Sequence, residues 1–209
     1  MTCAAFSGTV RGSVKPYDVI IIGGGIVGLA TAWELANRYP SKSFVVMEKE
    51  PAVAVHQSGI RHGLLHSGIY YNPGSRKAVT CARGREIMKA FCDMYGIPIR
   101  TCGKAIVASC QAELPALQEL YMRGKRSGIP CELVGPRRLK EIEPHAEGLA
   151  AIHVKTTAVL DYSQVCNVLL SELARLGRYV MLNTEVLEIK EMPTETLIVT
   201  NHGRHYARY

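Results

Sequence analysis

The clearest pattern near the start of the chain is a continuous apolar run within residues 17–22 (YDVIII), which ends in glycines. A run of this kind predicts a strand that is buried on both faces, as in a parallel sheet. Alanine and leucine then recur at helical spacing over residues 26–39, and Pro40 closes the predicted helix. A second apolar run at residues 44–47 predicts the next strand, so this part of the chain reads as a β-α-β unit.

The periodic pattern stops between residues 51 and 73, where glycine, histidine and tyrosine predominate and a long ordered loop is expected. Later segments alternate between helical and extended patterns, which predicts the α/β class. Helices are expected from Ser75 to about residue 95, over residues 113–126, and from a cap at Asp161 or Ser163 to Gly177. Further strands are expected at residues 103–109, 148–155, 179–182, 184–189, 196–200 and 205–209.

Composition narrows the class of protein. The chain has 209 residues, of which 47% are hydrophobic and 21% charged, so it can form a globular core. Its formal charge of +7 favours acidic ligands, and a dinucleotide or a dicarboxylate satisfies that charge as well as nucleic acid does. The basic clusters lack interleaved aromatic residues for stacking on bases, so no nucleic-acid partner is expected.

Cysteine usage and the two ends of the chain add further expectations. The seven cysteines form no CxxC pair, so neither a metal site nor a closed disulfide framework is predicted. The most apolar run, residues 19–33, is too short and too rich in glycine for a transmembrane helix, so any membrane association is expected to be peripheral.

Residues 1–16 contain basic residues and no acid, as in a flexible tail or the remnant of a transit peptide. The last predicted strand runs to the end of the sequence, so we expect a truncated chain.

The glycines after the first strand form the pattern GxGxxG of dinucleotide sites. Gly23 would make the tight turn, Gly25 would let the backbone approach a pyrophosphate, and Gly28 would let the helix pack closely on the strand. The helix then begins at Ile26 and Val27, whose N–H groups would face the phosphates. Glu48 follows Gly28 by 20 residues at the end of the second strand, where a carboxylate accepts from a ribose hydroxyl. The acid disfavours NADP, while this motif leaves FAD and NAD both open.

The segment from His56 to Tyr71 (HQSGIRHGLLHSGIYY) separates these two cofactors. It resembles the flavin-contacting segment of the D-amino-acid-oxidase-like family of FAD-dependent oxidoreductases, and within it the L-2-hydroxyglutarate dehydrogenase branch. Further similarities are the stretches VAVHQS at residues 53–58, CGKAIVA at 102–108 and the pairs at 143–144 and 161–162. The resemblance spans residues 17–209 and implies FAD as the cofactor. It departs at residues 61–62, where Arg-His replaces the Asn-Ser pair usual in the family.

The resemblance implies a Rossmann-like FAD-binding domain of the GR2 type with part of a mixed-sheet substrate domain. Its domain boundaries would be residues 17–100 and 156–209 for the FAD-binding domain and residues 101–155 for the substrate domain, after the tail of residues 1–16. Family members continue beyond a strand that resembles the last residues of this chain. The sequence is therefore expected to be incomplete at its carboxyl terminus.

The activity implied is the oxidation of L-2-hydroxyglutarate to 2-oxoglutarate, with a quinone or an electron-transfer protein as electron acceptor. Location would be mitochondrial in a eukaryote, and cytoplasmic or peripheral to the inner membrane in a bacterium. Two alternatives remain open at this point, namely a non-catalytic flavin-binding fragment and a related flavoenzyme acting on an amine or on glycerol 3-phosphate. An NAD-dependent dehydrogenase would need a second nucleotide-binding half, which the sequence does not show.

Candidate site residues follow from the same resemblance. His66 is the candidate flavin-proximal base, because histidine titrates near neutral pH. Tyr70 and Tyr71 could line a substrate pocket or pack with their hydroxyls at the surface, and Lys104 and Arg61 could face a substrate carboxylate or lie in solvent. Val186 matches the position where the family's backbone meets the adenine, although a core valine is an equal reading. The remaining candidates for contacts with FAD are Lys49, His56, Ser58 and Gly63.

Overall fold

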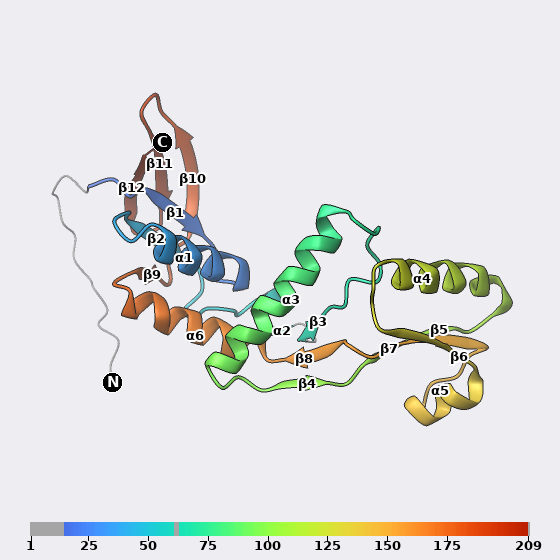
Figure 1. Ribbon diagram of the computed structural model, residues 1–209. Coiled ribbons are helices and arrows are strands. Elements are labelled where there is room, and N and C mark those ends of the chain that lie inside the picture. The colour runs from blue at the N-terminus through green and yellow to red at the C-terminus, as the bar shows by residue number, and fades with distance from the viewer. Residues whose placement is uncertain (1–14, 61–62, 209) are drawn as a thin grey trace. The chain divides into compact units, whose positions relative to one another are not determined.

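The computed structural model describes residues 15–60 and 63–208 (Figure 1). These residues form two compact units, of which the first holds the chain up to His56 and from Cys166 onward, and the second holds Gln57–Val165. The predicted boundaries place residues 57–100 and 156–165 in the FAD-binding domain. The predicted boundaries divide the chain by function, whereas the two units are defined by compactness. The predicted domain boundaries therefore stay a prediction.

A parallel sheet forms the centre of the first unit. Its strands are β1 (Val19–Ile22), β2 (Phe44–Met47) and β9 (Tyr179–Met181), in the order β1-β2-β9. Helix α1 (Ile26–Arg38) connects β1 to β2, and α6 (Tyr162–Arg175) precedes β9. The β-α-β unit predicted from the periodic pattern is confirmed, with Val19 opposite Phe44 and Ile22 opposite Met47.

Burial in this sheet differs from the prediction for its first strand. All four residues of β2 are buried, whereas β1 is half-buried and Ile22 is 50% exposed. The prediction of complete burial for β1 was wrong, because β1 lies at the edge of the described sheet and β2 at its centre. A central strand is covered on both faces, whereas an edge strand has a neighbour on one side alone.

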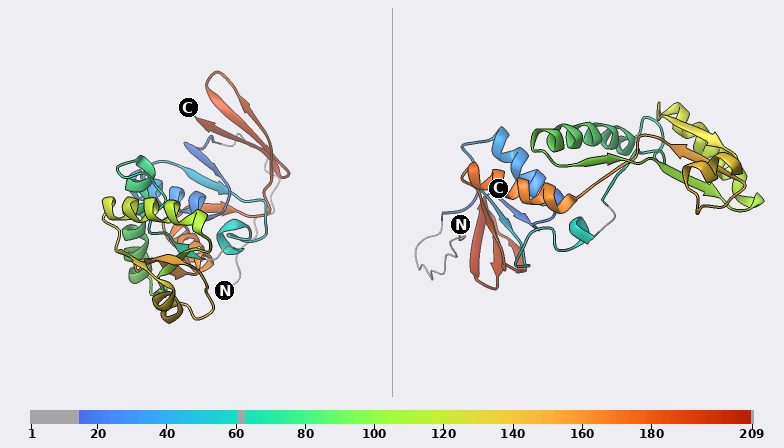
Figure 2. Two further views of the ribbon diagram at one scale, coloured as in Figure 1. Left: turned by 90° about the vertical axis from the view of Figure 1, so that its right-hand side faces the viewer. Right: turned by 90° about the horizontal axis from the view of Figure 1, so that it is seen from below.

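A three-stranded antiparallel meander completes the first unit. It consists of β10 (Val186–Glu191), β11 (Glu195–Thr200) and β12 (Gly203–Arg208). Ile198 of β11 packs against Val45 and Met47, while α1 also packs on β2. Figure 2 shows α1 and the meander on different sides of the parallel sheet. The sheet is thus covered by a helix on one face and by strands on the other.

The second unit is built around an antiparallel sheet of three strands, β5 (Lys104–Ala108), β7 (Ala150–Val154) and β6 (Cys131–Val134). Alternation along the strands sends Ile152 towards α4 (Leu114–Arg126) and Ala151 towards α5 (Pro136–Ile142). Each helix therefore covers one face of this sheet.

The remaining elements of the second unit include a smaller sheet in the order β3-β8-β4. Their bounds are β3 (Leu64–Leu65), β8 (Ala158–Leu160), β4 (Ile99–Thr101), α2 (Gln57–Ile60), α3 (Arg76–Met94) and the 3-10 helix η1 (Gln111–Glu113). The long loop predicted at residues 51–73 is thus interrupted by α2 and β3. Ser75 caps α3 as predicted, since its side chain accepts from the Ala78 N–H at 3.2 Å.

Candidate functional site

A hollow of about 270 Å³ lies in the first unit, at the carboxyl ends of β1 and β2. It brings together five predicted cofactor residues, namely Gly23, Glu48, Lys49, His56 and Val186. The other lining residues are Ile22, Met47, Thr184 and Glu185. Ligands of open α/β sheets bind at this end of the strands, so the hollow is the first candidate site.

The glycine turn has the geometry that a phosphate-binding loop requires. Gly23 has a φ of +107°, a conformation that favours glycine, and its N–H donates to the Met47 carbonyl at 2.8 Å. A side chain at Gly28 would place its Cβ 2.0 Å from the Gly23 carbonyl oxygen. Gly28 therefore permits the close approach of α1 to β1, which is the role predicted for it.

The amino terminus of α1 offers positive potential to a bound anion. The helix begins at Ile26 after Gly25, and its first turn, which includes Val27, contains no acidic residue. Gly25 provides no side-chain cap, so nothing on that residue covers the end of the helix. Because the first N–H groups of a helix lack partners within the helix, this end fits a pyrophosphate.

The Glu48 carboxylate is fixed from two sides by backbone N–H groups. Its Oε2 accepts from Gly24 at 2.5 Å and its Oε1 accepts from Glu50 at 2.9 Å. The residue is only 9% exposed, so these bonds hold a buried carboxylate at the wall of the hollow. Each carboxylate oxygen can accept a second hydrogen bond, which leaves capacity for a hydroxyl such as that of a ribose.

Two of the predicted cofactor residues share an acidic neighbour. His56 Nε2 lies 3.0 Å from Glu50 Oε1, and Lys49 Nζ lies 3.9 Å from the same oxygen. Both basic side chains are more than half exposed. One acidic and two basic side chains thus lie together beside the Glu48 carboxylate. These exposed ion pairs add little to the stability of the fold.

Val186 lies both at the hollow and against the core, and its contact with an adenine stays a prediction. It begins β10, lines the hollow, and is also packed against the cluster of Val45, Met47 and Ile198. Its side chain is half-buried. Because Val186 packs against this cluster, the start of β10 lies at the wall of the hollow.

Ser58, Gly63 and His66 belong to the second unit. Ser58 lies on α2, and Gly63 has a φ of +61° with its carbonyl accepting from the Leu160 N–H at 2.9 Å. His66 is exposed, and its carbonyl oxygen lies 3.7 Å from the Cys81 sulfur. Burial raises the pKa of the Cys81 thiol, which keeps it protonated as the donor to this carbonyl.

Two of the predicted substrate residues lie against each other in the second unit. Lys104 Nζ lies 3.3 Å from the Tyr70 hydroxyl and 4.4 Å from the centre of its ring. Tyr71 is next in the chain and is half-buried, and its N–H closes a turn on the Gly68 carbonyl at 3.0 Å. The fourth predicted substrate residue, Arg61, lies outside the described residues.

Sequence reasoning missed the four other residues that line the hollow of the first unit and one residue of the second site. Thr184 and Glu185 line the hollow of the first unit, and the Arg123 guanidinium donates to the Tyr70 carbonyl at 3.2 Å. The position of Thr184 shortly after the predicted strand of residues 179–182, which follows a predicted helix, could have indicated the first two. No sequence signal joins Arg123 to Tyr70, because they lie 53 positions apart.

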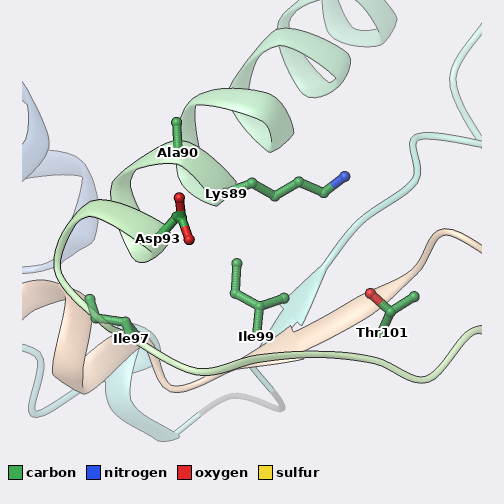
Figure 3. A pocket seen from close by; sticks show the side chains of 6 residues that line it. All are labelled: Lys89, Ala90, Asp93, Ile97, Ile99 and Thr101. Atoms are coloured by element: carbon green, nitrogen blue, oxygen red, sulfur yellow. The ribbon is translucent and has the colours of Figure 1, made fainter.

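A larger hollow of about 510 Å³ lies in the second unit beside α3 and β4 (Figure 3). Figure 3 shows Lys89 and Asp93 on the helix above Ile99 and Thr101. None of the predicted site residues lines it, and its Lys89 already pairs with Glu86 at 3.4 Å. The smaller hollow is the better candidate, because it joins a glycine turn, a helix amino terminus and a fixed carboxylate.

Across residues 15–60 and 63–208, no group of three or more histidine, cysteine, aspartate or glutamate side chains is placed to hold a metal ion. Within the same ranges, none of the helices has the length and apolar character that crossing a membrane requires.

Comparison with known proteins identifies the family. The model of the family described as "FAD dependent oxidoreductase" (DAO) matches residues 18–209. The chain therefore belongs to the DAO family of FAD-dependent oxidoreductases, and both the predicted fold class and the FAD prediction agree with this membership.

Individual relatives and a solved structure show which members of the family the chain is similar to. The chain is 45% identical over 83% of its length to "L-2-hydroxyglutarate dehydrogenase, mitochondrial" of Nematostella vectensis, and covers 38% of that protein. It is 37% identical over 91% of its length to L-2-hydroxyglutarate dehydrogenase of Escherichia coli K12, and covers 45% of it. Among solved structures, L-alpha-glycerophosphate oxidase of Mycoplasma pneumoniae with FAD bound matches with a TM-score of 0.78 and 25% identity, over 90% of this chain and 50% of that one. The chain thus spans less than half the length of these two relatives.

Proposed function

We propose that this chain forms the cofactor-binding half of an FAD-dependent dehydrogenase that oxidises L-2-hydroxyglutarate to 2-oxoglutarate. The observation that carries the proposal is the hollow where Gly23, Glu48 and Val186 meet at the carboxyl ends of parallel strands. The choice of substrate is supported by the names of the relatives from Nematostella vectensis and Escherichia coli.

In this proposal the chain's residues bind and orient the cofactor. The turn at Gly23 and Gly25, with the N–H groups of Ile26 and Val27, would hold the pyrophosphate, and Glu48 would accept from the ribose. FAD, when bound, supplies the acceptor of the hydride from C2 of the substrate. Its remaining predicted contacts are Gly28, Lys49, His56, Ser58, Gly63 and Val186.

The chemistry at the substrate requires a base and cations. His66 would take the proton of the substrate hydroxyl, since the residue is exposed and imidazole is a common general base in proteins. Tyr70, Tyr71, Lys104 and Arg61 would face the substrate, whose two carboxylates require positive charge and hydrogen-bond donors. The electron acceptor would be a quinone or an electron-transfer protein. Location would be mitochondrial in a eukaryote, or cytoplasmic or peripheral to the inner membrane in a bacterium.

The proposal is tested by flavin absorbance. The purified 209-residue chain is loaded with FAD without oxygen and then mixed with L-2-hydroxyglutarate, D-2-hydroxyglutarate, glycine or glycerol 3-phosphate. We expect the flavin band to bleach with L-2-hydroxyglutarate alone, because hydride transfer reduces the flavin.

Other results would change the proposal in defined ways. Bleaching by glycine or glycerol 3-phosphate, but not by L-2-hydroxyglutarate, would overturn the choice of substrate. A flavin that binds and stays oxidised with every compound would assign this chain to flavin binding without catalysis.

A further inference from the structure

We propose that Tyr70 and Lys104 act as one carboxylate-binding pair and that Arg123 is the residue that positions this pair. The inference rests on the proposed function, because it assigns the pair to one carboxylate of the dicarboxylate substrate. It adds Arg123, a residue of α4 that neither the glycine motif nor the loop motifs indicate (Figure 1).

Lys104 has no carboxylate partner within the part of the chain that the structure describes. Its Nζ contacts the hydroxyl and the ring face of Tyr70, and no carboxylate among the described residues is ion-paired with it. The side chain is half-buried at the start of β5, opposite Val154 in the neighbouring strand. A cation held over an aromatic ring keeps its full charge, so this ammonium can attract an anion.

The hydrogen-bond directions favour a carboxylate as that anion. Lys104 donates to the Tyr70 oxygen, so the phenolic hydrogen is left to donate elsewhere. The ammonium group carries three hydrogens and uses one of them here. One carboxylate can therefore accept from the tyrosine through one oxygen and from the lysine through the other, in charge-assisted bonds. Tyr70 is 50% exposed, so a ligand can reach the residue from solvent.

The backbone of the Tyr70 loop is held in place by three features. Gly68 has a φ of +84° and accepts from the Tyr71 N–H, which forms the turn. Ile69 is 1% exposed and fits so closely against α4 that a Cβ at Gly124 would lie 3.0 Å from its terminal carbon. Arg123, the neighbour of Gly124, donates through Nη1 to the Tyr70 carbonyl.

Arg123 acts on the loop without carrying free charge itself. Its Nη2 lies 2.9 Å from Glu119 Oε1, one helical turn earlier in α4, and its side chain is 27% exposed. The guanidinium thus links the helix to the loop by a bond to the backbone. Loss of this bond would free the Tyr70 carbonyl and let the hydroxyl move away from Lys104.

The test is a titration of the 209-residue chain with glutarate, followed by NMR, with the neutral diamide of glutaric acid as a second probe. We expect glutarate to bind and the diamide to bind at least about tenfold more weakly, since only the carboxylate gains charge-assisted bonds. Lys104→Met should weaken glutarate binding about tenfold, and Tyr70→Phe, which keeps the ring, should weaken it about fivefold.

Arg123 is tested by variants that separate its two contacts. Arg123→Met should weaken glutarate binding about fivefold, and Arg123→Lys should restore part of it, while diamide binding stays unchanged. Glu119→Gln breaks only the ion pair, and Lys155→Met removes a lysine that Glu132 already neutralises, so both should bind glutarate as the parent chain does.

Equal binding of glutarate and the diamide, or an unchanged affinity in Lys104→Met, would overturn the carboxylate-binding pair. An unchanged affinity in Arg123→Met would overturn the positioning role alone. Bleaching of the flavin by L-2-hydroxyglutarate is measured separately. If L-2-hydroxyglutarate bleaches the flavin and Lys104→Met binds glutarate as tightly as the parent chain, this inference is refuted and the proposed function is kept. If glutarate binding depends on Lys104 but the flavin is not bleached, this inference is kept and the proposed function is refuted.

Discussion

Replacing Gly28 with alanine is expected to abolish FAD binding and to destabilise the first unit. The added Cβ would lie 2.0 Å from the Gly23 carbonyl oxygen, a backbone atom that cannot move without opening the turn. Overpacking against backbone should cost about 3 kcal/mol of unfolding free energy, the upper end of the usual range. Urea denaturation followed by circular dichroism measures the stability, and a titration with FAD measures the loss of binding.

A matched control lies in α3. Gly84 is also a helical glycine, but a Cβ there would meet nothing within 4 Å. Gly84→Ala should therefore raise stability by about 0.5–1 kcal/mol and leave FAD binding unchanged. Normal FAD affinity and stability in Gly28→Ala would show that α1 does not approach β1 as closely as described.

Replacing Glu48 with glutamine should produce the second large effect. The two carboxylate oxygens accept from the N–H groups of Gly24 and Glu50, so an amide NH₂ would have to face one of these donors. A buried donor left without an acceptor costs about 1–3 kcal/mol. We expect lower stability in urea and FAD binding that is weaker by about 10- to 100-fold, because the ribose also loses its acceptor.

The control for this substitution is Glu188→Gln on β10. Glu188 is 51% exposed and pairs with Lys190 at the surface, so its substitution should change neither stability nor FAD affinity appreciably. If Glu48→Gln bound FAD as tightly as the parent chain, the carboxylate would have no part in the cofactor site.

The β1-α1-β2 unit could be predicted from the sequence because its signals are local. A continuous apolar run, a glycine turn and helical spacing lie within one stretch of chain, and Glu48 follows at a fixed separation. The close approach at Gly28 agrees with the role that the motif assigns to it. The half-burial of β1 could not be predicted, because burial depends on which strands lie on either side.

Features that depend on contacts between distant parts of the chain could not be predicted from the sequence. The pair of Tyr70 and Lys104 joins residues 34 positions apart, and Ile69, the neighbour of Tyr70, lies against Gly124 of α4. Strand β9 adds to β2 rather than to β10, its neighbour in sequence. Short strands such as β3 and β8 carry too few residues for a periodic signal.

In the proposed function the hollow at Gly23 and Glu48 binds the ADP half of FAD, and a competition titration can test this binding. The 209-residue chain is titrated with FAD, with FMN, and with FAD in the presence of ADP, and flavin fluorescence reports the bound fraction. We expect FAD to bind, ADP to displace it, and FMN, which lacks the ADP half, to bind far more weakly. FMN binding as tight as that of FAD, or FAD binding that ADP does not reduce, would contradict it.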